Sequence, residues 1–178
     1  LIDDCSTDNS KEICQRLQGK DERIKFLCLS KNSGPACARN TGIHLAVGKY
    51  LGFVDSDDYI DEDLFEIVHT ALLVGDIDCL KFGLIEEYYD SKGEKINYRN
   101  VCRIETGDFH SADAIKKQIV NLEMIPLFGY LCNGFYRRDI VESNHLSLDE
   151  TFIVNEDFNF NIRFFKCVNF LKCIDYHG

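Results

Sequence analysis

Short apolar runs alternate with amphipathic stretches along the first half of the chain. Residues 24–29 and 50–54 are apolar on both faces, as in strands buried within a parallel sheet, and Leu1-Ile2 has the character of the end of a third such strand. Helical spacing predicts three helices, at about 10–17, 36–47 and 61–74. This alternation predicts an α/β fold in which helices flank a mainly parallel sheet.

The second half of the chain has a less regular pattern. The elements predicted there are a strand at 77–82, a hairpin whose strands at 85–89 and 94–98 flank the turn residues 91–93, a helix at 111–121 capped by Ser111, a short strand at 129–136, a helix at 155–168 and a strand at 170–174. No linker or repeat separates these parts. We therefore expect one domain, 1–178, with a regular half at 1–82 and an irregular half at 83–178.

The charge of the chain restricts its partners. Its 178 residues include 30 acidic and 20 basic residues, for a formal net charge of -10, which argues against nucleic acid as the main partner. Phosphate groups would bind only where a metal ion or a local basic patch offsets this charge. The nine cysteines are scattered without metal-binding spacing, which is typical of reduced thiols in a cytoplasmic protein.

Two acidic clusters follow predicted strands. Asp3-Asp4 comes after the first strand, and Asp55-Ser56-Asp57-Asp58 comes after the strand at 50–54. Ligands of open parallel sheets bind beyond the carboxyl ends of the strands, and carboxylates gathered there favour a hard cation such as Mg²⁺ or Mn²⁺. The alternative is that these aspartates only stabilise turns and cap helices, both common roles for Asp.

Two further segments combine charge with a predicted helix start. Arg39 lies early in the helix after the loop 32–35, where free backbone N–H groups and a guanidinium could bind an anion. The Glu156-Asp157 pair could supply a general base. Each has a structural alternative, since Arg39 could be an ordinary surface residue and the acidic pair could complement the helix dipole. The segment 133–138 (NGFYRR) could face a sugar or form an ordinary strand and helix start.

These motifs occur together in an order known from one family. They are the acidic turn at 3–8 (DDCSTD), the segment 32–42 (NSGPACARNTG), the segment 48–58 (GKYLGFVDSDD) and the pair Glu156-Asp157. In this order and spacing the chain resembles the inverting family-2 glycosyltransferases with a GT-A fold. It is most similar to the bacterial enzymes that build capsule, lipopolysaccharide and other surface polysaccharides.

The resemblance implies a role for each motif. It implies that the donor nucleotide contacts Asp3, Asp4, Ser6, Arg39 and Asp55. Asp57, together with Asp55, would hold the Mn²⁺ or Mg²⁺ ion that bridges the two phosphates. Asp157 would be the catalytic base, with Glu156 as its neighbour. Residues 1–82 would then form the nucleotide-sugar-binding half, and 83–178 the acceptor-side half that carries the base.

The resemblance also implies the reaction and its partners. A sugar would pass, with inversion, from a nucleotide-sugar donor, usually a UDP-sugar, to a hydroxyl group of a saccharide or lipid-linked acceptor. The expected location is the cytoplasm, including the inner face of the cell membrane, where segments outside this chain could provide peripheral attachment. Nucleic acid is not an expected partner.

The chain departs from the family pattern in two respects. Cys5 occupies a position usually held by Gly, which affects the shape of the turn after Asp4. The family's first strand, with its Pro-x-x-Asn segment and the following helix, is absent from the sequence, as is the family's C-terminal continuation. We therefore expect the chain to be a fragment truncated at both ends, whose own activity depends on the missing segments.

Other protein classes share some of these residues. A phospho-receiver domain also has an Asp-Asp pair and a later Asp, and Lys81 could serve as its lysine, but it gives no role to Asp57 or to the Glu156-Asp157 pair. A haloacid-dehalogenase-type phosphatase uses Asp-x-Asp but expects Thr or Val where this chain has Tyr59. A non-catalytic sugar-nucleotide-binding fragment is the remaining alternative.

Overall fold

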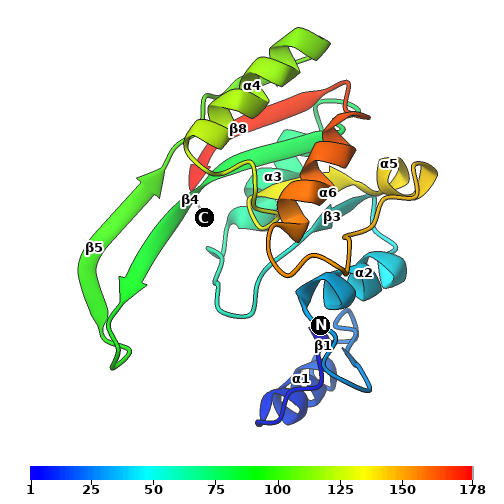
Figure 1. The fold of residues 1–178 in the computed structure, drawn as a ribbon, viewed down its shortest axis with the longest axis vertical. Helices are drawn as coiled ribbons and strands as arrows, with labels where there is room; N and C mark the ends of the chain where they lie inside the picture. Colours follow the sequence, from blue (N-terminus) through cyan, green and yellow to red (C-terminus); the bar gives the residue numbers. More distant parts are fainter. Residues whose placement is uncertain (178) are drawn as a thin grey trace.

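A central mixed sheet carries helices on both of its faces (Figure 1). The structure, a computed structural model, describes residues 1–177, with side chains at all of these positions except 97–99. The strand order is β3 (Tyr50–Gly52), β7 (Gly134–Arg137), β4 (Cys79–Tyr89), β8 (Leu171–His177) and β6 (Gly107–Phe109), and β5 (Lys95–Cys102) pairs with the far part of β4. β1 (Ile2–Asp3) and β2 (Leu27–Cys28) form a separate parallel pair.

The predicted α/β class is confirmed, but the central sheet is mixed rather than mainly parallel. β4 and β8 pair in parallel, whereas β7 is antiparallel to both β3 and β4, and β6 is antiparallel to β8. β3, β4 and β8 therefore share one direction, with β7 inserted between the first two. The apolar character of β7 indicates a buried strand but carries no information about its direction, which depends on the connections at its ends.

Alternate residues of β4 face two separate cores. Cys79 packs in the core beneath α4 (Ala112–Met124) and α6 (Glu156–Phe165), whereas Leu80 and Phe82 pack against α3 (Leu64–Leu72) on the opposite face. This arrangement follows from the two-residue period of a strand. The remaining helices are α1 (Ser10–Gln18), α2 (Pro35–Leu45) and α5 (Arg138–Ser143).

Most predicted elements are present, with different lengths. The hairpin is confirmed: the Asp90 side chain accepts hydrogen bonds from the backbone N–H groups of Lys92 and Glu94 at its turn. Ser111 caps α4 by accepting a bond from the Ala114 N–H. The strand predicted at 24–29 is reduced to β2, and β6 had not been predicted as an element. Residues 133–138 form the strand and helix start that were one of the two alternatives for this segment, since β7 ends at Arg137 and α5 begins at Arg138. Residue 82, the expected boundary between the two halves, lies within the continuous strand β4.

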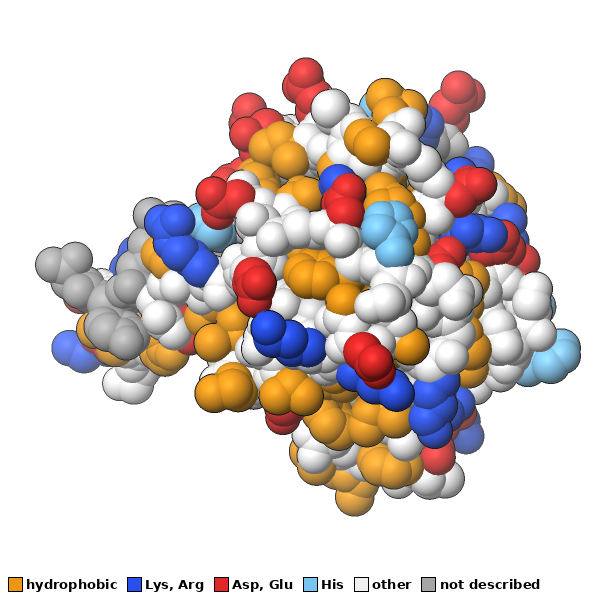
Figure 2. Space-filling view, turned by 90° about the horizontal axis from the view of Figure 1, so that it is seen from above, with side chains coloured by type: hydrophobic (Ala, Val, Ile, Leu, Met, Phe, Trp, Pro, Cys, Tyr) orange, Lys and Arg blue, Asp and Glu red, His pale blue; other side chains and the backbone are white. Residues whose placement is uncertain are grey.

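The surface, the cysteines and the helices each add one observation. On the face seen in Figure 2, Lys and Arg side chains are interspersed with Asp and Glu side chains. All nine cysteines are free thiols in this structure. Within the described residues, no helix combines the length and the apolar character needed to cross a membrane.

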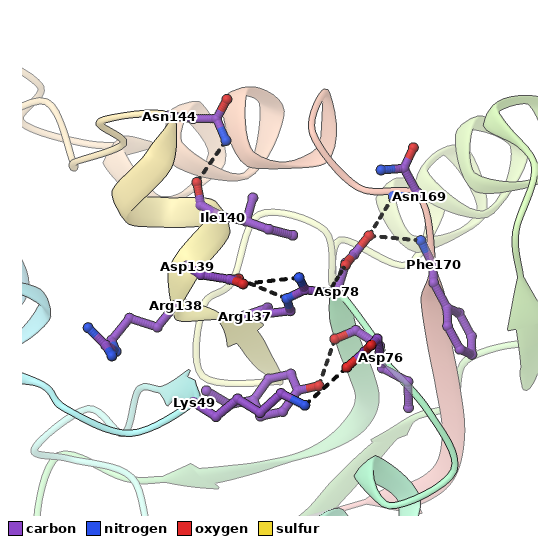
Figure 3. A network of polar contacts seen from close by, with 12 residues as sticks. Lys49, Asp76, Asp78, Arg137, Arg138, Asp139, Ile140, Asn144, Asn169 and Phe170 are labelled. Atoms are coloured by element: carbon purple, nitrogen blue, oxygen red, sulfur yellow. Dashed lines mark hydrogen bonds and ion pairs between the residues drawn. The ribbon is translucent and has the colours of Figure 1, made fainter.

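A buried carboxylate holds together the end of the sheet at which β4 and β8 begin and β7 ends (Figure 3). Asp78, only 5% exposed, accepts hydrogen bonds from the backbone N–H groups of Asn169 and Phe170 and from the Arg137 guanidinium. Arg137 also forms an ion pair with the exposed side chain of Asp139. One carboxylate thus satisfies donors from two other segments, which fixes the start of β8 beside the start of β4.

We expect Asp78→Ala to lower the free energy of unfolding by about 3 kcal/mol, because it leaves two backbone donors and a guanidinium without their acceptor. Asp139→Ala is the matched control, since it removes the exposed partner of the same Arg137 and should cost at most about 1 kcal/mol. Urea unfolding of both variants measures the difference. Equal losses would show that Asp78 has no special structural role.

Candidate active site

The Arg39 guanidinium joins carboxylates from two distant segments of the chain. Its Nη2 lies 2.6 Å from Asp55 Oδ1, while its Nη1 lies 2.9 Å from Glu156 Oε1 and 3.1 Å from Asp157 Oδ1. The Arg39 side chain is only 16% exposed. Three of the residues that the sequence singled out separately are therefore held by one cation, where ion pairing is stronger than at a fully solvated surface.

Local structure accounts for this meeting point. Asp55 follows the C-terminal end of β3, and Asp157 lies in the first turn of α6, preceded by Asn155 in the left-handed conformation at φ 66°. Asn40, beside Arg39 on α2, exchanges hydrogen bonds with both backbone groups of Leu148. These bonds fix the segment that leads into α6 against α2. Sequence reasoning gave no role to Asn40, because its partner is 108 residues away.

Asp157 has the environment of a proton acceptor. Burial raises the pKa of its carboxyl group to about 6, and the nearby negative charges of Glu156 and Asp55 add to the rise, while Arg39 and a hydrogen bond from the Leu131 backbone oppose it. At pH 7 the group is ionised and close to its pKa. This is the condition under which a carboxylate accepts a proton effectively.

The acidic turn gathers a set of possible metal ligands that differs in part from the predicted pair. Ligand atoms of Asp55, Asp58 and Cys132 lie within 4.8 Å of one another, whereas Asp57, exposed like Asp58, lies outside this group. Burial, together with the charges of Asp55 and Asp57, raises the pKa of Asp58. A divalent cation would relieve this repulsion, so the carboxylate oxygens fit Mg²⁺ or Mn²⁺. Burial raises the pKa of the Cys132 thiol to about 12, so it adds no negative charge.

A cavity of about 390 Å³ opens beside the acidic turn. Asp55, Asp57, Asp58 and their neighbours between residues 53 and 61 form one part of its wall. Residues from β4 and the segment before β7 form the other part, including Glu86, Glu87, Tyr89, Tyr130 and Cys132. The Tyr59 hydroxyl donates a hydrogen bond to Glu87, which connects the acidic turn to the hairpin. Sequence reasoning did not identify Cys132 or Tyr130, because no spacing pattern relates them to the acidic turn.

The turn after β1 is built around two aspartates. Asp4 accepts hydrogen bonds from the backbone N–H groups of Ser33 and Gly34 at 2.8 and 2.7 Å, just before α2 begins. Hydrogen bonds from Ser6 and then from Cys28 hold the pKa of the buried Asp3 below its ordinary value. Asp4 thus positions the loop before α2, while Asp3 holds its own turn against β2, and Ser6 keeps an exposed side chain.

Lys81 does not occupy the position that a phospho-receiver domain requires. It is fully buried in β4, and its ammonium donates to the Tyr130 carbonyl, Asn133 Oδ1 and the Tyr136 hydroxyl. Asp55 instead contacts Arg39. Lys81 therefore does not lie beside Asp55, as the lysine of a phospho-receiver domain lies beside its phospho-accepting aspartate.

Comparison with known proteins identifies the family. The family model described as "Glycosyl transferase family 2" matches residues 1–144. The chain belongs to this family. Membership agrees with the resemblance drawn from the four sequence motifs, and it excludes the phospho-receiver and phosphatase alternatives.

Several relatives carry glycosyltransferase names. The chain is 28% identical over 175 residues to "Uncharacterized glycosyltransferase EpsJ" of Bacillus subtilis (strain 168), covering 98% of this chain and 49% of EpsJ. It is 46% identical over 66 residues to "Putative teichuronic acid biosynthesis glycosyltransferase TuaG" of the same organism, covering 37% of this chain and 26% of TuaG. The matched part of the chain thus corresponds to about half the length of EpsJ and about a quarter of the length of TuaG.

Solved structures share the fold of this family-2 chain. Residues 1–349 of TarS from S. aureus superpose with a TM-score of 0.76 at 24% identity, covering 99% of this chain and 49% of that one. The same fragment in complex with UDP gives a TM-score of 0.77 at 23% identity, again covering 99% of this chain and 49% of that one. At this level of identity the likeness establishes the fold.

We expect Cys5→Gly to raise the free energy of unfolding by about 1 kcal/mol. Cys5 has a φ of 62°, in the left-handed region, where a side chain is disfavoured and glycine is not. Cys14→Gly is the control, since the same change inside α1 should instead cost up to about 1 kcal/mol. Urea unfolding measures both, and a loss of stability in Cys5→Gly would refute the strain at this turn.

Proposed function

We propose that this chain is the catalytic region of a metal-dependent, inverting glycosyltransferase. It transfers a sugar from a nucleotide-sugar donor, a UDP-sugar, to a hydroxyl group of a saccharide or lipid-linked acceptor in the synthesis of a bacterial surface polysaccharide. Family membership supports glycosyl transfer, and the similarity to TuaG, named as a teichuronic acid biosynthesis glycosyltransferase, supports a role in a cell-envelope polymer. The TarS structure in complex with UDP-GlcNAc supports the nature of the donor.

One observation carries the proposal: Arg39 places the half-buried Asp157 beside the acidic turn. A transferase needs its proton acceptor on one side of the reacting carbon and its diphosphate site on the other. Asp157, with a pKa raised to about 6, suits the first role, and Asp55 with its neighbours suits the second. Glu156 shares the guanidinium and orients the pair.

The reaction follows from these positions. The acceptor oxygen attacks the anomeric carbon while the Asp157 carboxylate takes the hydroxyl proton, and the bond from that carbon to the nucleoside diphosphate breaks, its electron pair leaving with the diphosphate. A divalent ion, when bound, neutralises the negative charge that develops on the departing group. We propose Asp55 and Asp57 as ligands of Mn²⁺ or Mg²⁺, and we add Asp58 from the geometry; the neutral Cys132 thiol borders the site without serving as a ligand.

The nucleotide end of the donor is assigned to the turn after β1. We propose that Asp3, Asp4 and Ser6 contact the nucleobase. The bonds from Ser33 and Gly34 to Asp4 support a fixed turn at this place, beside the N-terminal end of α2. Arg39 lies farther along the same helix, so α2 would connect the base-binding turn to the diphosphate site.

We expect Asp157→Asn to retain UDP binding and to lower the transfer rate by about a hundredfold to ten-thousandfold, the usual contribution of a general base. Glu156→Gln, which alters the other carboxylate on the same guanidinium nitrogen, should cause a clearly smaller loss. In the protein without substitutions, called the parent protein below, kcat/KM should fall as the pH drops through about 6, because Asp157 becomes protonated.

Release of nucleoside diphosphate from a panel of nucleotide sugars, with and without an acceptor, measures these rates. Normal transfer by Asp157→Asn would refute the base assignment. UDP binding without transfer of any sugar would instead favour a non-catalytic sugar-nucleotide-binding chain.

We expect Asp57→Ala and Asp58→Ala each to weaken Mn²⁺-dependent UDP binding by more than about tenfold, because each removes a carboxylate from the cation site. Asp61→Ala is the matched control: Asp61 lines the same cavity but is not one of the proposed ligands, so UDP affinity should stay unchanged. Calorimetry with and without Mn²⁺ gives the affinities. Equal effects of all three changes would show that the turn acts only through its total charge.

A further inference from the structure

Lys81 is a buried cation held by neutral groups. Its side chain is 0% exposed, and its ammonium donates at 2.8 Å to the Tyr130 carbonyl, at 2.7 Å to Asn133 Oδ1 and at 2.8 Å to the Tyr136 hydroxyl. An ammonium has three N–H donors, so all of them are satisfied. The salt bridges among the described residues include none to Lys81.

This arrangement is costly for the stability of the fold. Lysine is almost never fully buried unless it is paired, because transferring its charge from water to the interior is unfavourable. Burial lowers the pKa of Lys81 to about 8, so the group is still a cation at neutral pH. A methionine of similar length would avoid this cost. The site therefore contains a charge that packing alone does not require.

The partners of Lys81 belong to the segment 127–133, which connects α4 to β7, and to β7 itself. Asn133 donates from Nδ2 to the Leu127 carbonyl at 3.0 Å, which closes the segment on itself. Asn161 of α6 donates to the carbonyls of Phe128 and Tyr130 at 2.7 and 3.2 Å. The segment is thus held from β4 on one side and from α6 on the other.

The same segment reaches the active site. Tyr130 and Cys132 line the cavity beside the acidic turn, and between them the Leu131 backbone forms a hydrogen bond with the Asp157 carboxylate. A displacement of the Tyr130 carbonyl would therefore move the group that bonds to Asp157.

We propose that Lys81 is a positioning residue for the transfer reaction: its ammonium fixes the segment 127–133 so that the Leu131 N–H meets the carboxylate of Asp157. The proposal rests on the function proposed above. The positive charge of Lys81 also favours the ionised form of that carboxylate through space.

Several other ionisable groups face Asp157 and also bear on the pKa of its carboxyl group. Arg39 approaches from α2, Asp55 from the end of β3 and Glu156 from its own helix. Cys132 and Tyr136, both neutral at pH 7, approach from the segment before β7 and from β7. Among these groups Arg39 is the cation in direct contact, and Lys81 is the buried cation behind the segment.

The test compares Lys81→Met, which removes the charge at similar length, with the parent protein. We expect kcat to fall about tenfold to a hundredfold, because a loosened segment misplaces the base. The acid limb, which is the fall of kcat/KM on the acidic side of its pH profile, should shift to a higher pH by about one unit. The reason is that the Asp157 carboxylate loses the nearby positive charge that favours its ionised form. UDP affinity should stay unchanged. An unmoved acid limb with unchanged kcat would overturn the proposal.

Further variants separate positioning from general stability. Gln118→Leu removes another buried polar group, which donates to the Glu105 carbonyl away from the site, and should lower stability without moving the acid limb. Lys81→Arg keeps the charge and should leave the limb near the parent position. Lys81→Gln keeps hydrogen-bond donors without charge; it replaces Lys81→Met if that variant does not fold, and it should move the limb upward.

A measurement without turnover separates this proposal from the proposed function. The ¹³C shift of the Asp157 carboxyl carbon, assigned with Asp157→Asn, reports its pKa directly. A higher Asp157 pKa in Lys81→Met or Lys81→Gln supports the link from Lys81 to Asp157 even if the parent transfers no sugar. An unchanged Asp157 pKa in an active protein refutes the role of Lys81 and leaves the proposed function standing.

Discussion

The geometry of the site depends on the contact between Arg39 and three carboxylates. Asp55 lies 16 residues from Arg39 along the chain, and Glu156 lies 117 residues from it. Without the guanidinium, these acidic groups would repel one another and separate the end of β3 from the start of α6. One cation does not neutralise three anions. The remaining negative charge lies beside Asp58, where it favours a further cation, which is the condition that a diphosphate requires.

Two buried charges, Asp78 just before β4 and Lys81 on it, hold the framework around this contact. Asp78, at the base of the strand, satisfies backbone donors at the start of β8. Lys81, three residues farther along, satisfies acceptors in the segment 127–133. In both cases a charged side chain meets polar groups of a connecting segment, so that segment has one favourable position. β4 and the residue before it therefore order two connecting segments, in addition to the two cores that β4 contributes to.

The sequence predicted the elements better than their arrangement. The hairpin turn at Asp90 and the cap of α4 at Ser111 were predictable because a few adjacent residues determine them. β6 was missed because its three residues form a strand only through pairing with β8. The insertion of β7 between β3 and β4 was missed for a similar reason, since strand order depends on contacts between distant segments.

The sequence by itself determined the family and most of the candidate site, because Asp55, Arg39 and Asp157 lie in motifs whose order and spacing are visible in one dimension. Only the tertiary structure decided how these residues meet, that Asp58 and Cys132 gather with Asp55, and that Lys81 is buried behind the segment next to Asp157. The physical reason is the separation along the chain between the residues that interact. Turns and caps depend on neighbouring residues, whereas ion pairs, cavities and pKa values depend on which distant segments the fold brings within a few ångströms.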